Sequence, residues 1–314
     1  MKKTFIILTA LSSLNIYAYD LGVGLPEVEK EKGVSGISVE LNYKNINSEK
    51  SPVDNIKNIY RLLQNNNDIL FETLKNDNLE TDYLFKINAG YLNGRDLKSP
   101  NVSVVLGTSL DEENRIGMAF TYNDFENKYA GLKYDGKGYH FSLFHSQKED
   151  NKNFQTIAYV GSADEKEKND EKRDNTYWGI HTRYEHIEEI YNELYKGYRI
   201  DIEGKQLRTK EKELKKTNDS VKAGIKGIAK KEIEVADDHK LSIELLAGYE
   251  REFMEERIYK DRMKDDFKDS LTIEVKGSYD VAEIITTYVS LQGRKSLNTS
   301  NTESMITAGI QYKF

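Results

Sequence analysis

The chain has 314 residues, a formal net charge of -7 and no cysteine, and 32% of its residues are charged. Without cysteine it has no disulfide, thiol nucleophile or cysteine-bound metal, and its negative charge argues against nucleic acid as a partner. Such a polar composition is typical of a soluble chain. It also fits a membrane β-barrel, because a barrel needs apolar residues only on the lipid side of each strand.

The amino terminus has the pattern of a secretory signal peptide. Lys2 and Lys3 precede an apolar run over residues 5–14, and Ala18 provides a small residue for cleavage. The run is too short to cross a bilayer as a helix. We therefore expect residues 1–18 to be removed when the chain is exported from the cytoplasm.

A short N-terminal segment is expected over residues 19–50, as an exposed leader or the remnant of a passenger. Its first part is acidic and contains Pro26. Residues 34–44 then alternate apolar and polar side chains, which is the pattern of a strand. We interpret this stretch as a small strand outside the main domain, which is expected over residues 51–314.

A helix is predicted over residues 52–75, where the period of the pattern changes. Ser51 suits the N-cap, Pro52 the first helical position and Asp54 the positive end of the helix dipole. The apolar side chains that follow are spaced by three, four and seven residues and form one stripe: Ile56, Tyr60, Leu63, Leu70 and Leu74. This helix is the clear departure from a strand pattern in the mature chain.

From about residue 82 to residue 314, apolar and polar side chains alternate in twelve segments separated by turn residues. Each segment has the two-residue period of a strand with one apolar face. The last segment carries this apolar parity to its final residue, with Ile306, Ala308, Ile310, Tyr312 and Phe314. A final strand with aromatic residues at its end is typical of outer-membrane barrels. We therefore predict that these side chains face lipid and that this strand directs membrane insertion.

The opposite parity of these strands carries charged side chains. Its members include Lys86, Arg183, Arg199, Asp201, Glu203, Lys222, Lys226, Glu244, Glu274 and Lys276. Such charges do not fit a dry core, so we predict that they line the polar lumen of a barrel. In a soluble sandwich the same residues would face bulk water, and alternation alone does not separate the two folds.

The lengths of the connections between strands favour the barrel. Those after odd-numbered strands are predicted to be long and charged, at residues 123–138, 162–176, 207–219 and 251–269, whereas those after even-numbered strands are short. This asymmetry is typical of outer-membrane barrels. The predicted fold class is therefore all-β, a transmembrane antiparallel up-and-down β-barrel of about 12 strands preceded by one α-helix.

The chain from about residue 54 to its end resembles the translocator, or β-domain, of the monomeric autotransporters of type V secretion. The resemblance rests on the helix ahead of the strands and on four segments, GTSLDEENRIGMAFTY, NTYWGIHTRYEH, KLSIELLAGYERE and the terminal AGIQYKF. It implies a barrel in the outer membrane of a Gram-negative cell, with the helix in the lumen and a passenger carried to the cell surface. The N-terminal segment is too short for the β-helical passenger usual in the family, so we expect the barrel to anchor or export a short segment.

The resemblance also implies partners and one reaction. The partners are outer-membrane lipid, periplasmic chaperones and the barrel-assembly machinery, and the barrel is expected to be a monomer without cofactors. Some members of the family release their passenger by cyclisation of an asparagine in the lumen helix. By analogy, Asn65 or Asn66 is a candidate for self-cleavage, and Glu203, Glu244 or Glu274 would orient its amide.

Two other functions stay open as alternatives. One is a small porin-like channel, with the helix outside the lumen, or a surface protein that acts through its loops. The other is a barrel enzyme of the lipase or protease kind, which needs a nucleophile and a base near the membrane surface. His140 and His181 share the lumen parity but have no evident catalytic companion, and no histidine pair has metal-binding helix spacing. We therefore expect neither an enzyme nor a metal site.

Overall fold

The structure, a computed structural model, describes residues 53–75, 83–94, 97–129, 132–167, 172–211, 214–256, 268–282, 284–298 and 302–313. The helix α2 spans Val53–Lys75, where the sequence predicts a helix. The strands are β1 Tyr83–Gly94, β2 Leu97–Ser109, β3 Asn114–Tyr129, β4 Leu132–Glu149, β5 Lys152–Glu167, β6 Lys172–Tyr191, β7 Leu194–Glu211, β8 Leu214–Ala236, β9 His239–Glu256, β10 Asp269–Val281, β11 Ile285–Ser296 and β12 Thr302–Lys313. The predicted signal peptide, the 19–50 segment with its 34–44 strand, and Phe314 lie outside the described residues.

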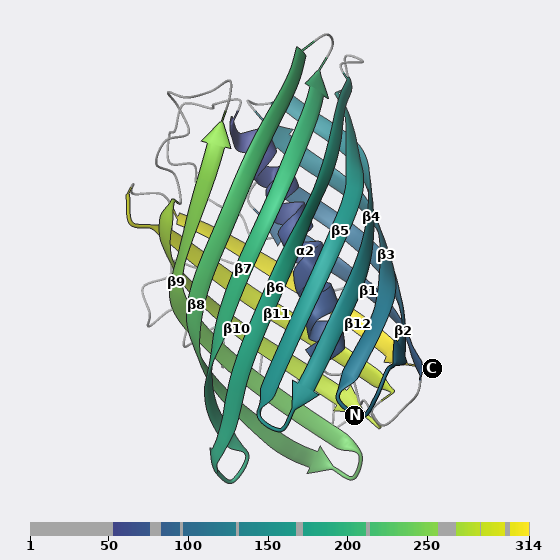
Figure 1. Cartoon of the computed structure of the whole chain (residues 1–314), viewed down its shortest axis with the longest axis vertical. Helices are drawn as coiled ribbons and strands as arrows, with labels where there is room; N and C mark the ends of the chain where they lie inside the picture. The colour runs from purple at the N-terminus through teal and green to yellow at the C-terminus, as the bar shows by residue number, and fades with distance from the viewer. Residues whose placement is uncertain are drawn as a thin grey trace, which may run out of the picture. The chain divides into compact units, whose positions relative to one another are not determined.

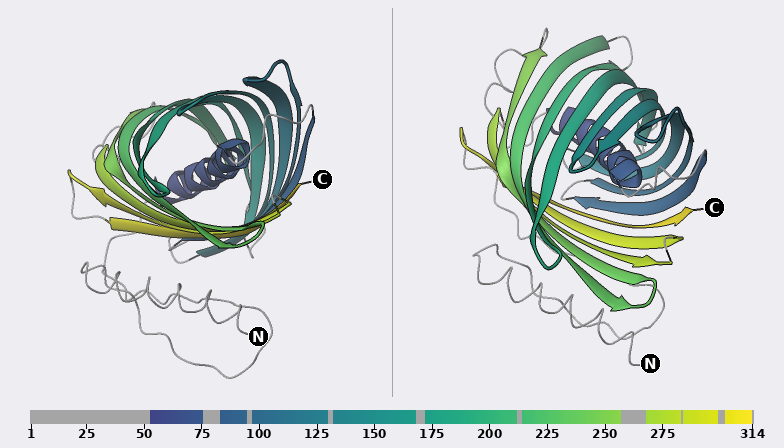
Figure 2. Two further views of the ribbon diagram at one scale, coloured as in Figure 1. Left: turned by 90° about the horizontal axis from the view of Figure 1, so that it is seen from below. Right: turned by 60° about the horizontal axis from the view of Figure 1, so that its bottom comes forward.

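These strands form one closed barrel, in which each strand is antiparallel to its neighbour in the sequence (Figure 1). β1 and β12 close the barrel, with pairing from Lys86 opposite Lys313 to Gly94 opposite Met305. The view along the barrel shows α2 inside the ring of strands (Figure 2). The predicted fold class, with its helix in the lumen, is confirmed. The helix position outside the lumen, which the channel alternative assumed, is wrong.

The two faces of the barrel wall carry different side chains. On β6, Trp178 and Ile180 are 54% and 50% exposed, whereas His181 and Arg183 are each 3% exposed. Other exposed apolar side chains on the same outer face include Val102, Leu106, Met118, Phe120, Leu143, Val160, Ile202, Val221, Ile225, Leu245, Leu271 and Ile310. An apolar exterior around a charged interior is the reverse of a soluble fold and fits a wall in contact with lipid. Within the described ranges, no helix is both long and apolar enough to cross a bilayer.

The prediction of long connections after odd-numbered strands is wrong for three of the four stretches. The β3–β4, β5–β6 and β7–β8 pairs continue through them, leaving only residues 130–131, 168–171 and 212–213 between the strands. Beyond the lipid the outer face of a strand meets water, so polar residues replace apolar ones there while the backbone ladder continues. The fourth connection, between β9 and β10, comprises residues 257–268.

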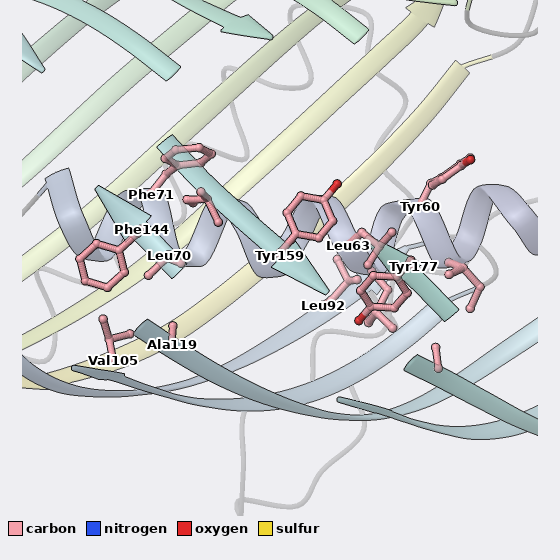
Figure 3. Close-up of a cluster of buried hydrophobic side chains, with 14 of the residues drawn as sticks. Tyr60, Leu63, Leu70, Phe71, Leu92, Val105, Ala119, Phe144, Tyr159 and Tyr177 are labelled. Carbon is pink, nitrogen blue, oxygen red and sulfur yellow. The ribbon is translucent and has the colours of Figure 1, made fainter. Parts of the chain in front are cut away.

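The apolar core lies between one face of α2 and part of the barrel wall (Figure 3). The wall contributes inward-facing residues that include Leu84, Leu92, Val105, Ala119, Phe144, Ile157, Tyr159, Tyr177 and Leu207. The sequence predicted only polar and charged side chains at the inward-facing positions of the strands. That prediction is incomplete, because these apolar residues occupy inward-facing positions too. An amphipathic helix must cover its apolar stripe, and in this barrel the inner wall does so.

Candidate functional site

The helix crosses the lumen in a defined direction. We call the barrel end with residues 237–238, between β8 and β9, the turn end, and the opposite end with residues 257–268 the loop end. The Asn58 side chain near the start of α2 donates to Asn127 Oδ1 at 2.6 Å, close to the loop end of β3. At the other end of α2, Lys75 Nζ lies 2.8 Å from Glu244 Oε2, near the turn end of β9.

One face of α2 carries polar side chains at spacings of three and four residues. We call this set the polar stripe: Arg61, Gln64, Asp68, Glu72 and Lys75. Each member contacts a side chain of the barrel wall, and the partners are Glu303, Lys222, Arg183, Lys276 and Glu244 in the same order. The polar stripe therefore forms a series of contacts along the lumen, from the loop end to the turn end.

A cluster of buried charges lies near the turn end of the helix. Arg199, 1% exposed, forms ion pairs with Glu185 and, at 3.6 Å, with Glu72 on the helix. Arg183 donates to Asp201 Oδ1 at 2.8 Å and to Asp68 Oδ1 at 2.7 Å. Charges removed from water need paired partners, because an uncompensated buried charge is strongly destabilising. Helix and wall thus supply charges to a shared network.

The opposite face of α2 packs against apolar wall residues (Figure 3). At the edge between the two faces, Phe71 is fully buried, with its ring centroid 4.7 Å from that of His181 in an edge-on arrangement and 4.2 Å from the Arg183 guanidinium, which also pairs with Asp68 of the polar stripe. The helix lies closest to β1, β2, β3 and β5. Apolar contacts on this side and ion pairs on the other hold α2 against both parts of the wall.

The charged residues predicted to line the lumen all project inward. Nine are buried, and Lys276 is partly exposed, with 15% of its side-chain surface accessible. Lys86 donates to the Thr73 backbone oxygen at 3.1 Å, and Lys226 lies 2.9 Å from Glu250. The Glu274 carboxylate accepts from Ser290 Oγ at 2.9 Å.

The other two predicted sets are the apolar stripe of the helix and the lipid-facing residues of the last strand. Tyr60, Leu63, Leu70 and Leu74 of the helix stripe are buried in the core, and the side chain of Ile56 lies outside the described part of the chain. On β12, Ile310 and Tyr312 are 45% and 40% exposed on the outer face, and Ile306 and Ala308 share their parity. The outer face of β12 therefore presents the apolar set that the sequence assigns to lipid.

The asparagines proposed for self-cleavage have different surroundings. Asn65 Oδ1 accepts from Thr307 Oγ1 at 3.0 Å, whereas neither amide atom of Asn66 has a hydrogen-bond partner among the described residues. Glu203 accepts from Asn67 at 3.4 Å and from the Tyr159 hydroxyl at 2.8 Å. The structure thus brings a carboxylate to Asn67. No described carboxylate hydrogen-bonds the amide nitrogen of Asn65 or Asn66.

The two lumen histidines contact an aromatic ring and a carboxylate. His140 is buried and stacks on the Tyr159 ring at 5.2 Å, and neither of its ring nitrogens has a partner among the described residues. His181 Nε2 lies 3.2 Å from Asp201 Oδ1. Within the described ranges, no cluster of three or more histidine, aspartate or glutamate side chains has a metal-binding arrangement.

Several members of the network were missed from the sequence. Glu185 pairs with Arg199, and Lys205 donates to Glu203 at 2.7 Å. Glu250 lies within ion-pair distance of Lys222, Lys226 and Arg294. These residues share the inward parity of strands whose other charges were identified. Extending the alternation further along each strand would have found them.

A cavity of about 1190 Å³ lies between the polar stripe and the wall of β8 to β12. Its lining includes Asn65 and Glu72 of the helix and Lys276 of β10, and residues 236–240 at the turn end. The helix therefore fills part of the lumen and leaves polar space on one side.

Of the comparisons with known proteins, that with solved structures finds a shared fold. No protein-family profile matches the chain, and no curated protein matches it. Among solved structures, the β-domain of the Bordetella autotransporter BrkA has a TM-score of 0.57 at 12% identity, over 74% of this chain and 100% of that one. The translocator domain of autotransporter NalP from Neisseria meningitidis has a TM-score of 0.49 at 11% identity, over 83% and 98% of the two chains. LpxR from Salmonella typhimurium has a TM-score of 0.47 at 9% identity, over 73% and 100%. The chain thus has the fold of an outer-membrane β-barrel of the autotransporter β-domain kind.

Proposed function

We propose that this barrel is an autotransporter-type translocator, which anchors or exports its own N-terminal segment to the cell surface. The observation that carries the proposal is the direction of α2 through the lumen. The helix has 23 residues, a length of about 34 Å, and the hydrocarbon core of a bilayer is about 30 Å thick. A chain that enters α2 from the loop end and leaves it at the turn end therefore crosses the membrane inside the barrel.

The orientation of the barrel follows from its two ends. The turn end has connections of two to four residues, such as 150–151 and 192–193. At the loop end the connections 95–96, 130–131, 168–171 and 212–213 are as short, but the longest connection, residues 257–268, lies there. Outer-membrane barrels place short turns in the periplasm and longer loops outside. In this orientation the start of α2 faces the exterior, so the preceding residues leave the barrel on the cell-surface side.

The same proposal assigns partners to the barrel. The apolar outer face contacts outer-membrane lipid, and the export signal of residues 1–18 delivers the chain to periplasmic chaperones. The barrel-assembly machinery then reads β12, whose outer face carries Ile310 and Tyr312. One chain closes its own barrel through the pairing of β1 with β12, which supports a monomer. The proposal includes no catalytic step.

A tag on the N-terminal segment tests the proposal. An epitope placed within residues 20–45 is expected to bind antibody on intact cells. The matched controls are the same epitope within residues 257–268, expected to be labelled, and between Asp237 and Asp238, expected to be labelled only after the outer membrane is opened. If the N-terminal epitope follows the Asp237–Asp238 control, the proposed export is refuted.

A channel is the second candidate function, and the cavity beside α2 favours it. Single-channel conductance in planar bilayers separates the two, with the full chain compared with a variant that lacks residues 52–76. If the helix plugs the lumen, we expect a small conductance for the full chain and a much larger one for the variant that lacks residues 52–76. Equal, large conductance for both chains would favour a channel. Each barrel is first shown to be folded by its heat-dependent gel mobility.

A further inference from the structure

The side chains of Asn67 on α2 and of Glu203 and Lys205 on β7 meet inside the lumen. Glu203 Oε1 accepts from Asn67 Nδ2 at 3.4 Å, and Glu203 Oε2 accepts from Lys205 Nζ at 2.7 Å. Glu203 and Lys205 share the inward parity of β7, because they lie two residues apart on one strand. A single carboxylate therefore bridges an amide of the helix and an amine of the wall.

Water is excluded from these three groups. Asn67, Glu203 and Lys205 are 0%, 1% and 7% exposed. The Tyr60 ring covers Lys205, with Nζ 4.6 Å from the ring centroid, and the Tyr159 hydroxyl donates to Glu203 at 2.8 Å (Figure 3). Burial penalises both members of a charged pair. Transfer of one proton from the Lys205 ammonium to Glu203 leaves both groups neutral, so it costs less here than in water.

Hydrogen bonding alone does not account for Asn67 at this position. Its Oδ1 atom has no hydrogen-bond partner among the described residues, and a buried polar atom without a partner is destabilising. Asparagine is also a weaker helix former than alanine or leucine. The contact with Glu203 places the Asn67 amide beside the group that accepts a proton from Lys205. An amine that attacks an amide needs such a base within hydrogen-bond reach.

We propose that Lys205 and Asn67 become joined by an isopeptide bond, for which Glu203 is the base. Glu203 accepts a proton from Lys205 Nζ, and the neutral amine attacks Asn67 Cγ. The Nζ–Cγ bond forms, the Cγ–Nδ2 bond breaks, and Glu203 passes protons from Nζ to the departing Nδ2. Of the three ammonium protons, one remains on the new amide and two leave with Nδ2 as an ammonium ion. Glu203 returns to its carboxylate form, and no oxidant, reductant or other reactant is consumed.

Folding itself brings the reacting groups together. Helix packing and strand pairing hold the amine and the amide on one carboxylate, and this positioning replaces the encounter that two separate molecules need. Glu252, 3.6 Å from Lys205 Nζ, offers a second acceptor that orients the amine. The bond ties α2 covalently to β7, so the helix cannot leave the lumen and the chain ahead of it stays attached to the barrel.

Mass spectrometry of the purified, folded full chain tests for the bond. The mass of the mature chain is expected to be about 17 Da below that of its sequence, because ammonia is lost. Trypsin cleaves after Arg61, Lys75, Arg199 and Arg208, and it does not cleave after an acylated Lys205. The digest is therefore expected to contain a branched peptide in which residues 62–75 are joined to residues 200–208.

Three variants separate this bond from other causes of the mass loss. Lys205→Arg keeps the positive charge beside Glu203, and Asn67→Ala removes the amide, so each is expected to have the full mass of its sequence. Ring closure of Asn67 onto its own backbone also releases ammonia, but that reaction does not need Lys205. The matched control is Asn66→Ala. Asn66 is 2% exposed and its amide has no partner among the described residues, so this variant is expected to keep the mass loss.

Two kinds of result overturn the inference. The first is a parent chain with the full mass of its sequence and no branched peptide, and the second is a mass loss that persists in Lys205→Arg or disappears in Asn66→Ala. Heat-dependent gel mobility establishes that each barrel is folded, and if Lys205→Arg does not fold, the branched peptide of the parent decides. The surface-epitope experiment does not depend on Asn67 or Lys205, so the two proposals fail separately.

Discussion

Neutralising Glu72 is expected to loosen α2 from the barrel wall. Glu72 Oε1 lies 2.6 Å from Lys276, 3.6 Å from Arg199 and 3.7 Å from Arg183, so it offsets three cations. Removing one partner of a buried ion pair lowers the free energy of unfolding by about 3–5 kcal/mol. The Glu72 side chain keeps 19% of its surface exposed. We therefore expect Glu72→Gln to lie near the lower limit of that range, at about 3 kcal/mol.

A double-mutant cycle isolates the contact itself. Glu72→Gln and Lys276→Met are combined, and urea unfolding of each barrel in detergent is followed by tryptophan fluorescence. Side chains in direct contact have coupling energies of about 0.5–3 kcal/mol, and this partly buried pair is expected in the upper half of that range. The double-mutant cycle cancels the energy changes that each substitution causes outside the contact between Glu72 and Lys276.

The matched control is the ion pair of Glu188 and Lys196, whose atoms lie 3.2 Å apart but whose side chains are 45% and 60% exposed. Solvent screens such a pair, so its coupling energy is expected to be about 0.5 kcal/mol. If the coupling between Glu72 and Lys276 does not exceed that of the control, the polar stripe does not hold the helix, and the reasoning is refuted.

Three further predictions concern the core, the strand contacts and the lipid-facing surface. Phe71→Ala, at a fully buried position, is expected to lower the free energy of unfolding by about 3–5 kcal/mol in the same urea experiment. Gly117→Val is expected to prevent folding, because a Cβ at Gly117 would overlap the β2 backbone. A Cβ at Gly204 meets no atom within 4 Å, so Gly204→Ala is expected to fold. Heat-dependent gel mobility compares the two variants. Trp178, the single tryptophan of the chain and 54% exposed, is expected to be quenched by brominated acyl chains and not by iodide in the aqueous phase.

The alternation of side chains predicted the strands and their two faces correctly because it is a local property of the strand. Trp178 and Ile180 face outward and Arg183 faces inward, as their parity requires. Local periodicity also predicted α2, since Tyr60, Leu63 and Leu70 repeat at helical spacing and lie in the core. Both patterns are set by residues near one another in the sequence.

The parts that the sequence did not predict depend on the closed barrel. Leu92 and Phe144 have the inward parity, but only the position of α2 decides that this part of the wall is apolar. The pairing of Arg199 with Glu185 likewise depends on the register between β6 and β7. The ends of the strands were misplaced because charged residues such as those at 162–167 stay in strands beyond the lipid. The local sequence pattern does not indicate where along a strand the outer face leaves the lipid and meets water.

The order of charges along the lumen explains why α2 takes a single position along the barrel axis. Along the polar stripe, a cation at Arg61 faces Glu303, an anion at Glu72 faces Lys276, and a cation follows at Lys75. The wall therefore presents the opposite order of charges to the helix. Apolar packing on the other face does not fix the position of α2 along the barrel axis, because apolar side chains tolerate a shift by one turn far better than ion pairs do.

A shift of α2 by one turn, about 5.4 Å, reverses these contacts in either direction. Moved towards the turn end, Glu72 takes the place of Lys75 and meets the carboxylates of Glu185 and Glu244, which now lie 3.2 Å and 2.8 Å from the Lys75 ammonium. Moved towards the loop end, Lys75 takes the place of Glu72 and meets Lys276. Like charges at such distances in a buried site are unfavourable, so each slip is opposed. The apolar face thus keeps α2 in the lumen, and the charges decide where along the lumen it stops.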